Sequence, residues 1–238
     1  MTETPPCSYD EIAHEYYDPS RHPTCANFRE ASSLILRRWL QTVPQQKGRF
    51  CEVGAGKSLL VELLAGRAVE AELVITDCSP SMLSYSQRWA DERTRLIVAD
   101  STKLPLAHGC LDLLVSSLGD PYNDLKFWEE ARRLLRPGGA VFFTTPSYDW
   151  ATDFRGSGHR NGIEYAEFEL SNGERVYVPS KIYPRDKQTE LIGKAGLVVE
   201  GYAVVTLSEI TSSPLSPKLL PERGPGASVV EGYMVVKS

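Results

Sequence analysis

Five short and nearly continuous apolar segments alternate with helix-like segments through the middle of this 238-residue chain. The apolar segments span residues 49–53, 72–77, 95–100, 111–117 and 140–145. Strands that are apolar on both faces are typical of a parallel sheet with helices on each side. The alternation therefore predicts an α/β fold with a doubly wound, mostly parallel sheet and helices on both faces.

The segments between these strands carry helix signals. Leucines at helical spacing favour a helix over 58–66, and Ser79-Pro80 is a typical start for a second helix that runs through Trp89. A third helix is expected from about Leu125 to Leu135, where the sequence 136–139, Arg-Pro-Gly-Gly, would end it. These helices would cover the sheet between successive strands.

The C-terminal third has a different pattern. Residues 163–170 alternate between apolar and acidic side chains, Asn172-Gly173 follows, and 175–178 form a second short run. Asn-Gly between alternating runs favours a β-hairpin, which we expect at about 160–180. A helix over about 185–195 and strands over 197–207 and 229–236 complete a seven-stranded sheet whose final strand is antiparallel. A proline-rich loop, 212–226, joins these last two strands.

The segment 1–43 precedes the first strand and contains a helix signal of its own. Phe28, Ala31, Ile35 and Trp39 share one face of a helix expected over about 25–40, with Thr24 as its N-cap. A segment placed before the first strand of such a sheet can cover the cleft at the carboxyl ends of the strands. We therefore expect 1–43 to be a helical lid and 44–238 to be the main domain.

Composition narrows the functional class. The formal net charge of -5 argues against a protein that follows nucleic-acid phosphates, so nucleic acid is an unlikely partner. The five cysteines include no Cys-x-x-Cys pair and fit reduced thiols rather than a disulfide framework. No leader pattern is visible, and no segment approaches the roughly 18 apolar residues of a membrane span. We expect a cytoplasmic protein with no membrane association.

The turn after the first strand, residues 54–58, has three possible interpretations. Gly56-Lys57-Ser58 resembles the end of a nucleotide P-loop, but Cys51 stands where that motif needs a glycine. A dinucleotide fingerprint would need a third glycine where Leu59 stands. The third interpretation is the loop of a methyltransferase, and the residues around it favour that one.

Residues 50–145 resemble the class I (Rossmann-like) S-adenosylmethionine-dependent methyltransferases. Residues 52–58 match the family pattern acid-x-Gly-x-Gly-x-Gly except at the last glycine, which is Ser58. Asp77 ends the second strand, where an acid can hold ribose hydroxyls. Asp100 ends the third strand, where the family places a residue on the adenine amino group. The resemblance implies a Rossmann-like domain over 44–238 and S-adenosylmethionine as its cofactor.

The residues expected to bind this cofactor come from the N-terminal segment and the strand ends. In the family, an aromatic residue of a segment similar to 9–18 closes over the cofactor, and an arginine of the following helix could pair with the cofactor carboxylate. The predicted set is Tyr17, Arg29, Glu52, Gly54, Gly56, Asp77, Cys78, Asp100, Ser101 and Ser117.

Three residues are candidates for the reaction itself. His22 is a possible general base, and Asp120 and Tyr122 follow the fourth strand, where they would face the methyl group; Asp120-Pro121 could instead be a simple turn. His22 and Cys25 are too few ligands for a metal site, so we predict none.

The acceptor class stays open at this point. We expect methyl transfer to an oxygen, nitrogen or carbon atom of a small molecule, by a monomer or a homodimer. A methyltransferase that acts on nucleic acid or protein, or a protein that binds S-adenosylmethionine without catalysis, are the alternatives.

Overall fold

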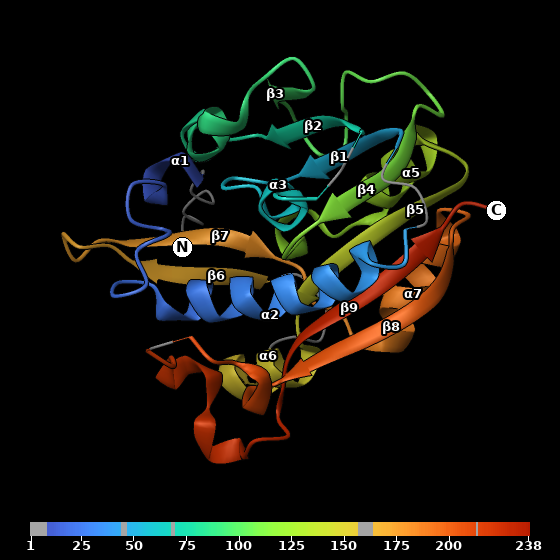
Figure 1. Ribbon diagram of the computed structural model, residues 1–238. Helices are drawn as coiled ribbons and strands as arrows, with labels where there is room; N and C mark the ends of the chain where they lie inside the picture. The colour runs from blue at the N-terminus through green and yellow to red at the C-terminus, as the bar shows by residue number, and fades with distance from the viewer. Residues whose placement is uncertain (1–8, 44–46, 68–69, 157–163, 213) are drawn as a thin grey trace, which may run out of the picture.

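A seven-stranded sheet forms the centre of the computed structural model, which describes residues 9–43, 47–67, 70–156, 164–212 and 214–238 (Figure 1). The strand order is β3-β2-β1-β4-β5-β9-β8, and β9 runs antiparallel to both of its neighbours, β5 and β8. The predicted doubly wound sheet with a final antiparallel strand is confirmed. The strands are β1 (Arg49–Val53), β2 (Glu72–Asp77), β3 (Thr94–Val98), β4 (Leu111–Ser116), β5 (Leu135–Pro146), β8 (Val198–Thr206) and β9 (Ser228–Val236).

Helices cover both faces of this sheet, and each face has its own core. One core joins α2 (Pro23–Leu40), α3 (Leu59–Leu64) and α6 (Tyr148–Arg155) to the sheet. The other joins α5 (Leu125–Leu134) and α7 (Arg185–Lys194) to the opposite face. In Figure 1, α2 lies in front of the sheet, and α5 and α7 lie behind it.

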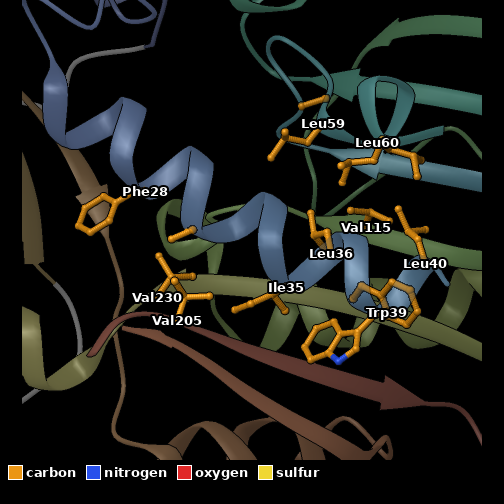
Figure 2. Close-up of a cluster of buried hydrophobic side chains, with 14 of the residues drawn as sticks. Phe28, Ile35, Leu36, Trp39, Leu40, Leu59, Leu60, Val115, Val205 and Val230 are labelled. Carbon is orange, nitrogen blue, oxygen red and sulfur yellow. The ribbon is translucent and has the colours of Figure 1, made fainter. Parts of the chain in front are cut away.

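Helix α2 packs across β5, β9 and β8 through the apolar face that its sequence predicts. Ile35 and Trp39 point toward the strands in Figure 2 and are buried. Gly232 of β9 makes room for them, because a Cβ there would lie 2.7 Å from the Trp39 ring. The predicted start of this helix was wrong: Pro23 begins it, His22 is the N-cap, and the Thr24 hydroxyl lies 2.7 Å from Ser216 Oγ.

A small third core joins the two segments that flank the sheet. Helix α1 (Tyr9–Ile12) contributes Ile12, and the hairpin of β6 (Glu164–Glu169) and β7 (Arg175–Ser180) contributes Leu170, Val176 and Val178. The predicted hairpin is thus confirmed over 164–180, whereas its first residues, 160–163, lie outside the described residues. Figure 1 shows the hairpin beside the N-terminal half of α2.

Several local expectations differ from the structure. The helix expected to run through Trp89 is one α-helical turn, α4 (Pro80–Leu83), followed by the 3-10 helix η1 (Ser84–Trp89). Helix α6 was not predicted. The loop 212–226 contains the 3-10 turns η5 (Pro217–Leu219) and η6 (Pro221–Arg223), and Leu219 anchors it in the first core. Two further 3-10 turns are η2 (Asp120–Tyr122) and η4 (Leu207–Glu209).

Candidate functional site

A cavity of about 350 Å³ lies at the carboxyl ends of the central strands. This edge is where open parallel sheets bind their ligands. Its walls come from the turns after β1 to β4, from the N-terminal segment and from one hairpin residue. The lining residues are Tyr9, Asp10, Tyr16, Tyr17, Cys25, Arg29, Gly54, Ala55, Asp77, Cys78, Ser79, Met82, Asp100, Ser101, Ser117, Leu118, Pro121, Tyr122 and Pro179.

The turn after β1 depends on two glycines in the left-handed conformation, Gly54 with φ of 58° and Gly56 with φ of 46°. A Cβ on Gly54 would lie 2.6 Å from the Tyr122 hydroxyl, and a Cβ on Gly56 would collide with the Tyr17 hydroxyl. Both positions therefore combine a backbone conformation that favours glycine with a close approach that only glycine allows. Gly54 lines the cavity; Gly56 lies behind its wall.

Glu52 does not line the cavity, because its carboxylate caps helix α3. It is fully buried, accepts hydrogen bonds from the backbone N–H groups of Leu59 and Leu60 at 3.1 Å, and accepts another from the Ser58 hydroxyl. The Ser58 hydroxyl also accepts from Val61 N at 3.1 Å, as a helix N-cap does. Ser58, which stands where the family pattern has its last glycine, thus takes part in the N-terminal capping of α3. Burial raises the pKa of Glu52 to about 7.

Asp77 connects the end of β2 to the glycine turn. One carboxylate oxygen accepts from Gly56 N and the other from Ser79 N, both at 2.9 Å. Only 6% of Asp77 is exposed, and burial raises the pKa of its carboxyl above the ordinary value. Each carboxylate oxygen has a second lone pair, so Asp77 can still accept from a hydroxyl inside the cavity that it lines.

Asp100, Ser101 and Cys78 lie on the same side of the cavity, after β3 and β2. Asp100 accepts from the backbone N–H and the hydroxyl of Thr102 through a single oxygen, Oδ1, at 2.8 Å. Two acids from neighbouring strand ends thus line one wall, the arrangement that a ribose and an adenine amino group would need.

The turn after β4 carries local backbone strain. Leu118 has φ of 55°, a conformation that costs a residue with a side chain of order 1–3 kcal/mol. Its N–H donates to Thr144 Oγ1 at 2.9 Å, and Ser32 Oγ of α2 lies 2.7 Å from both Thr144 Oγ1 and Ser117 Oγ. This hydroxyl cluster fixes the conformation of the turn, which places Ser117 and Leu118 in the wall of the cavity.

Tyr17 and Arg29 bring the N-terminal segment onto the glycine turn. The Tyr17 hydroxyl accepts from Lys57 N at 2.7 Å, and burial raises the pKa of Tyr17 well above its ordinary value. The Arg29 guanidinium lies 5.6 Å from the centroid of the Tyr17 ring and donates to Glu62 at 2.7 Å. Both residues line the cavity.

The three candidates for the reaction lie in different places. Tyr122 lines the cavity, where its hydroxyl donates to Val53 O at 2.9 Å and lies 3.0 Å from Ser116 Oγ. Asp120 lies behind the wall and accepts from Ser180 Oγ at 2.7 Å, and burial raises the pKa of Asp120 to about 6. His22 also lies outside the lining, with Nε2 at 3.2 Å from Glu15 Oε1. The catalytic roles of all three remain predictions.

Several residues that line the cavity were not predicted from the sequence. Tyr9 and Asp10 belong to the N-terminal stretch whose resemblance to the family suggested Tyr17, but nothing in the sequence pointed to Cys25 or Pro179.

Among the residues that the structure describes, no group of three or more histidine, cysteine, aspartate or glutamate side chains is arranged to hold a metal ion. No helix in the described part of the chain is long and apolar enough to cross a membrane.

The strand order, the glycine turn after β1 and the acids after β2 and β3 define a class of protein. They make this chain a Rossmann-like α/β protein with a cavity at the carboxyl ends of its central strands. Residues 51–143 match the family model described as "Methyltransferase domain".

Individual proteins similar to the chain are also methyltransferases. A malonyl-[acyl-carrier protein] O-methyltransferase of Marinomonas sp. (strain MWYL1) is 28% identical over 63% of this chain and 54% of its own length. That of Hahella chejuensis (strain KCTC 2396) is 35% identical over 40% of this chain and 35% of its own. The chain thus spans about half the length, or less, of these curated relatives.

A crystal structure of an S-adenosylmethionine-dependent methyltransferase from Mesorhizobium loti superimposes with a TM-score of 0.62. It covers 88% of this chain and 100% of that chain at 16% identity, a likeness of fold. The fold and the sequence match over residues 51–143 agree with the class I S-adenosylmethionine-dependent methyltransferase family that the sequence resembles. Members of this family use S-adenosylmethionine as the methyl donor, which agrees with the cofactor predicted from the sequence.

Proposed function

We propose that this protein transfers a methyl group from S-adenosylmethionine to a small-molecule acceptor. The observation that carries the proposal is the shape of the cavity. Its floor is the carboxyl-terminal edge of the sheet, and the N-terminal segment and Pro179 of the hairpin form its other walls, an enclosure that suits a small acceptor. A cavity of about 350 Å³ lies within the usual range of small-molecule sites.

The strand-end residues supply the chemistry that the cofactor needs. Asp77 would accept from the ribose hydroxyls, and Asp100 with Ser101 would hold the adenine amino group. Gly54 would let the cofactor approach the backbone closely, with Gly56 shaping the same turn. Arg29 is the only lysine, arginine or histidine among the described residues of the lining, which makes it the partner for the cofactor carboxylate.

The other half of the cavity would receive the acceptor. It is lined by aromatic and apolar side chains from three segments: Tyr9, Tyr16, Cys25, Leu118, Pro121, Tyr122 and Pro179. S-adenosylmethionine supplies an electrophilic methyl group on a sulfonium centre whose departure leaves a neutral thioether. The protein then has to exclude water and to hold the accepting atom in line with that methyl group, effects that account for much of the rate in such reactions.

The experiment that tests the proposal follows the methyl group. We would incubate the protein with S-adenosylmethionine that carries a deuterated methyl group and with fractionated small-molecule extracts, and search for labelled products by mass spectrometry. We expect a labelled small molecule with the protein as it stands and none with Gly56→Val.

Other labelled products would contradict the proposal. If the label appeared only on nucleic acid or on protein, including an acyl-carrier protein of the kind that the relatives' names contain, the acceptor would be macromolecular. If a folded protein bound no cofactor, the proposal would fail altogether.

A further inference from the structure

Three cationic side chains from three different elements converge on a single carboxylate, Glu62 of helix α3. Arg29 Nη2 of α2 lies 2.7 Å from Glu62 Oε2, and Lys57 Nζ and Arg88 Nη2 each lie 3.6 Å from Glu62 Oε1. Glu62 is half-buried, at 31% exposed. Glu62 thus faces three cations, of which Arg29 alone lines the cavity.

Arg29 connects this cluster to the cavity. Its guanidinium donates to Glu62 and lies over the face of Tyr17, and the Tyr17 hydroxyl accepts from the backbone N–H of Lys57. A guanidinium presents five N–H donors in a planar fork, so one edge can bind Glu62 while others face the cavity. The ion pair and the tyrosine ring together restrict the long arginine side chain to one orientation.

We propose that Glu62 is a positioning residue that holds Arg29 in the orientation that binds the carboxylate of the cofactor. This inference rests on the proposed function, because it needs the methionine end of S-adenosylmethionine to lie beside the glycine turn. Glu62 does not itself line the cavity, so it acts through Arg29. Because Lys57 and Arg88 also face Glu62, its negative charge is shared among three cations and does not neutralise Arg29 alone.

Two ligands separate this role from a general effect on the fold. S-adenosylhomocysteine has the amino-acid end, whereas 5′-methylthioadenosine has the same adenine, ribose and thioether without that end. We would measure the binding of both by calorimetry to the unmodified protein, to Glu62→Gln, to Arg29→Met and to the double variant. Glu190→Gln is the matched control, because Glu190 pairs with Lys187 and Lys194 on the surface of α7.

Losing charged hydrogen bonds to the carboxylate should make S-adenosylhomocysteine bind about tenfold or more weakly to Arg29→Met. Glu62→Gln should weaken it about three- to fivefold, since the guanidinium remains but is less fixed. Neither change should alter 5′-methylthioadenosine binding, and Glu62→Gln should add nothing in the Arg29→Met background. Glu190→Gln should leave both ligands unaffected.

Three results would overturn the inference. Tighter binding of S-adenosylhomocysteine to Glu62→Gln would make Glu62 a competitor for Arg29. Equal weakening of both ligands would show a general structural role. An undiminished effect of Glu62→Gln in the Arg29→Met background would mean that Glu62 does not act through Arg29. Failure of the unmodified protein to bind either ligand would instead overturn the proposed function.

Discussion

The two halves of the cavity are built in different ways. In the cofactor half, the acids at the strand ends are braced by neighbours on the same turn or on the adjacent strand end, as Asp77 is by Gly56 and Ser79. In the acceptor half, distant segments meet: Glu15 accepts from Ser171 N at 3.2 Å across 156 positions of the chain, and the third core joins α1 to the hairpin. The strand-end part of the cofactor half is therefore set by local geometry, and the acceptor half by tertiary packing.

From this difference we expect substitutions in the cofactor half to weaken cofactor binding, and most strongly at the glycine turn. Gly56→Val forces a branched side chain into a left-handed backbone and into the Tyr17 hydroxyl. We expect calorimetry to show S-adenosylhomocysteine binding weakened more than ~100-fold, which corresponds to about 3 kcal/mol.

Gly193→Ala is the control for that variant. Gly193 lies in α7, where a Cβ meets open space, so the alanine should leave binding unchanged and stabilise the helix slightly. If Gly56→Val bound the ligand normally, the glycine turn would not be the cofactor site.

Asp77→Ala should have the second largest effect. It removes the expected ribose partner and leaves the N–H groups of Gly56 and Ser79 without their acceptor, which should weaken S-adenosylhomocysteine binding by roughly 1–3 kcal/mol. Asp91→Ala is matched, because Asp91 accepts from Arg93 N and Thr94 N in a turn that does not line the cavity. Equal affinities of these two variants would exclude Asp77 as the ribose ligand.

Asp120→Ala tests the acceptor half. Asp120 binds the Ser180 hydroxyl and accepts from Lys181 N through its carbonyl at 2.7 Å, so it fixes the end of the hairpin beside Pro179. We expect about tenfold slower methyl transfer with unchanged S-adenosylhomocysteine affinity, because only the acceptor wall is loosened. Asp120→Asn, which can still accept from Ser180, should retain most of the rate. A loss of cofactor affinity in Asp120→Ala would mean that the two halves are not separate.

Asp120 should also affect the pH dependence of stability. Burial raises the pKa of Asp120 from its ordinary value near 3.8 to about 6, so the folded protein holds this proton more tightly than the unfolded chain. Asp120 should therefore contribute a fall in the free energy of unfolding as pH rises from about 4 to about 6.

Asp120→Asn should remove that part of the slope, and urea unfolding of both proteins at a series of pH values would measure the difference. Glu52, whose pKa burial raises to about 7, adds a fall of the same sign that extends to about pH 7 in both proteins. Identical pH profiles would show that Asp120 is not the buried acid that the structure describes.

The same contrast explains what could be predicted from the sequence. The strands of the sheet, the helix starts between them and the glycine turn have local signals: buried strand runs, Ser79-Pro80, and acids at strand ends. Asn172-Gly173 predicted the hairpin, but no local pattern predicted that the end of the hairpin would lie beside Asp120. His22 was chosen for the chemistry of its side chain and Asp120 for its place after β4. The structure shows each bound to a partner from elsewhere in the chain, Glu15 or Ser180.

Glu52 shows a subtler limit. The family pattern has an acid at this position. The contacts of Glu52 with Ser58, Leu59 and Leu60 form only when α3 packs against β1. Pro179 and Cys25 reach the cavity only because the hairpin and α2 pack beside the strand ends. Such positions follow from long-range packing, which no local pattern encodes.

A crystal structure with bound S-adenosylhomocysteine would test the division of the cavity most directly. We expect the ribose at Asp77, the adenine beside Asp100 and Ser101, and the amino-acid end at Arg29. The sulfur should face the space between Ser117, Tyr122 and the hairpin. Adenosine placed against Tyr9, Cys25 and Pro179, or a ligand bound outside this cavity, would contradict the account.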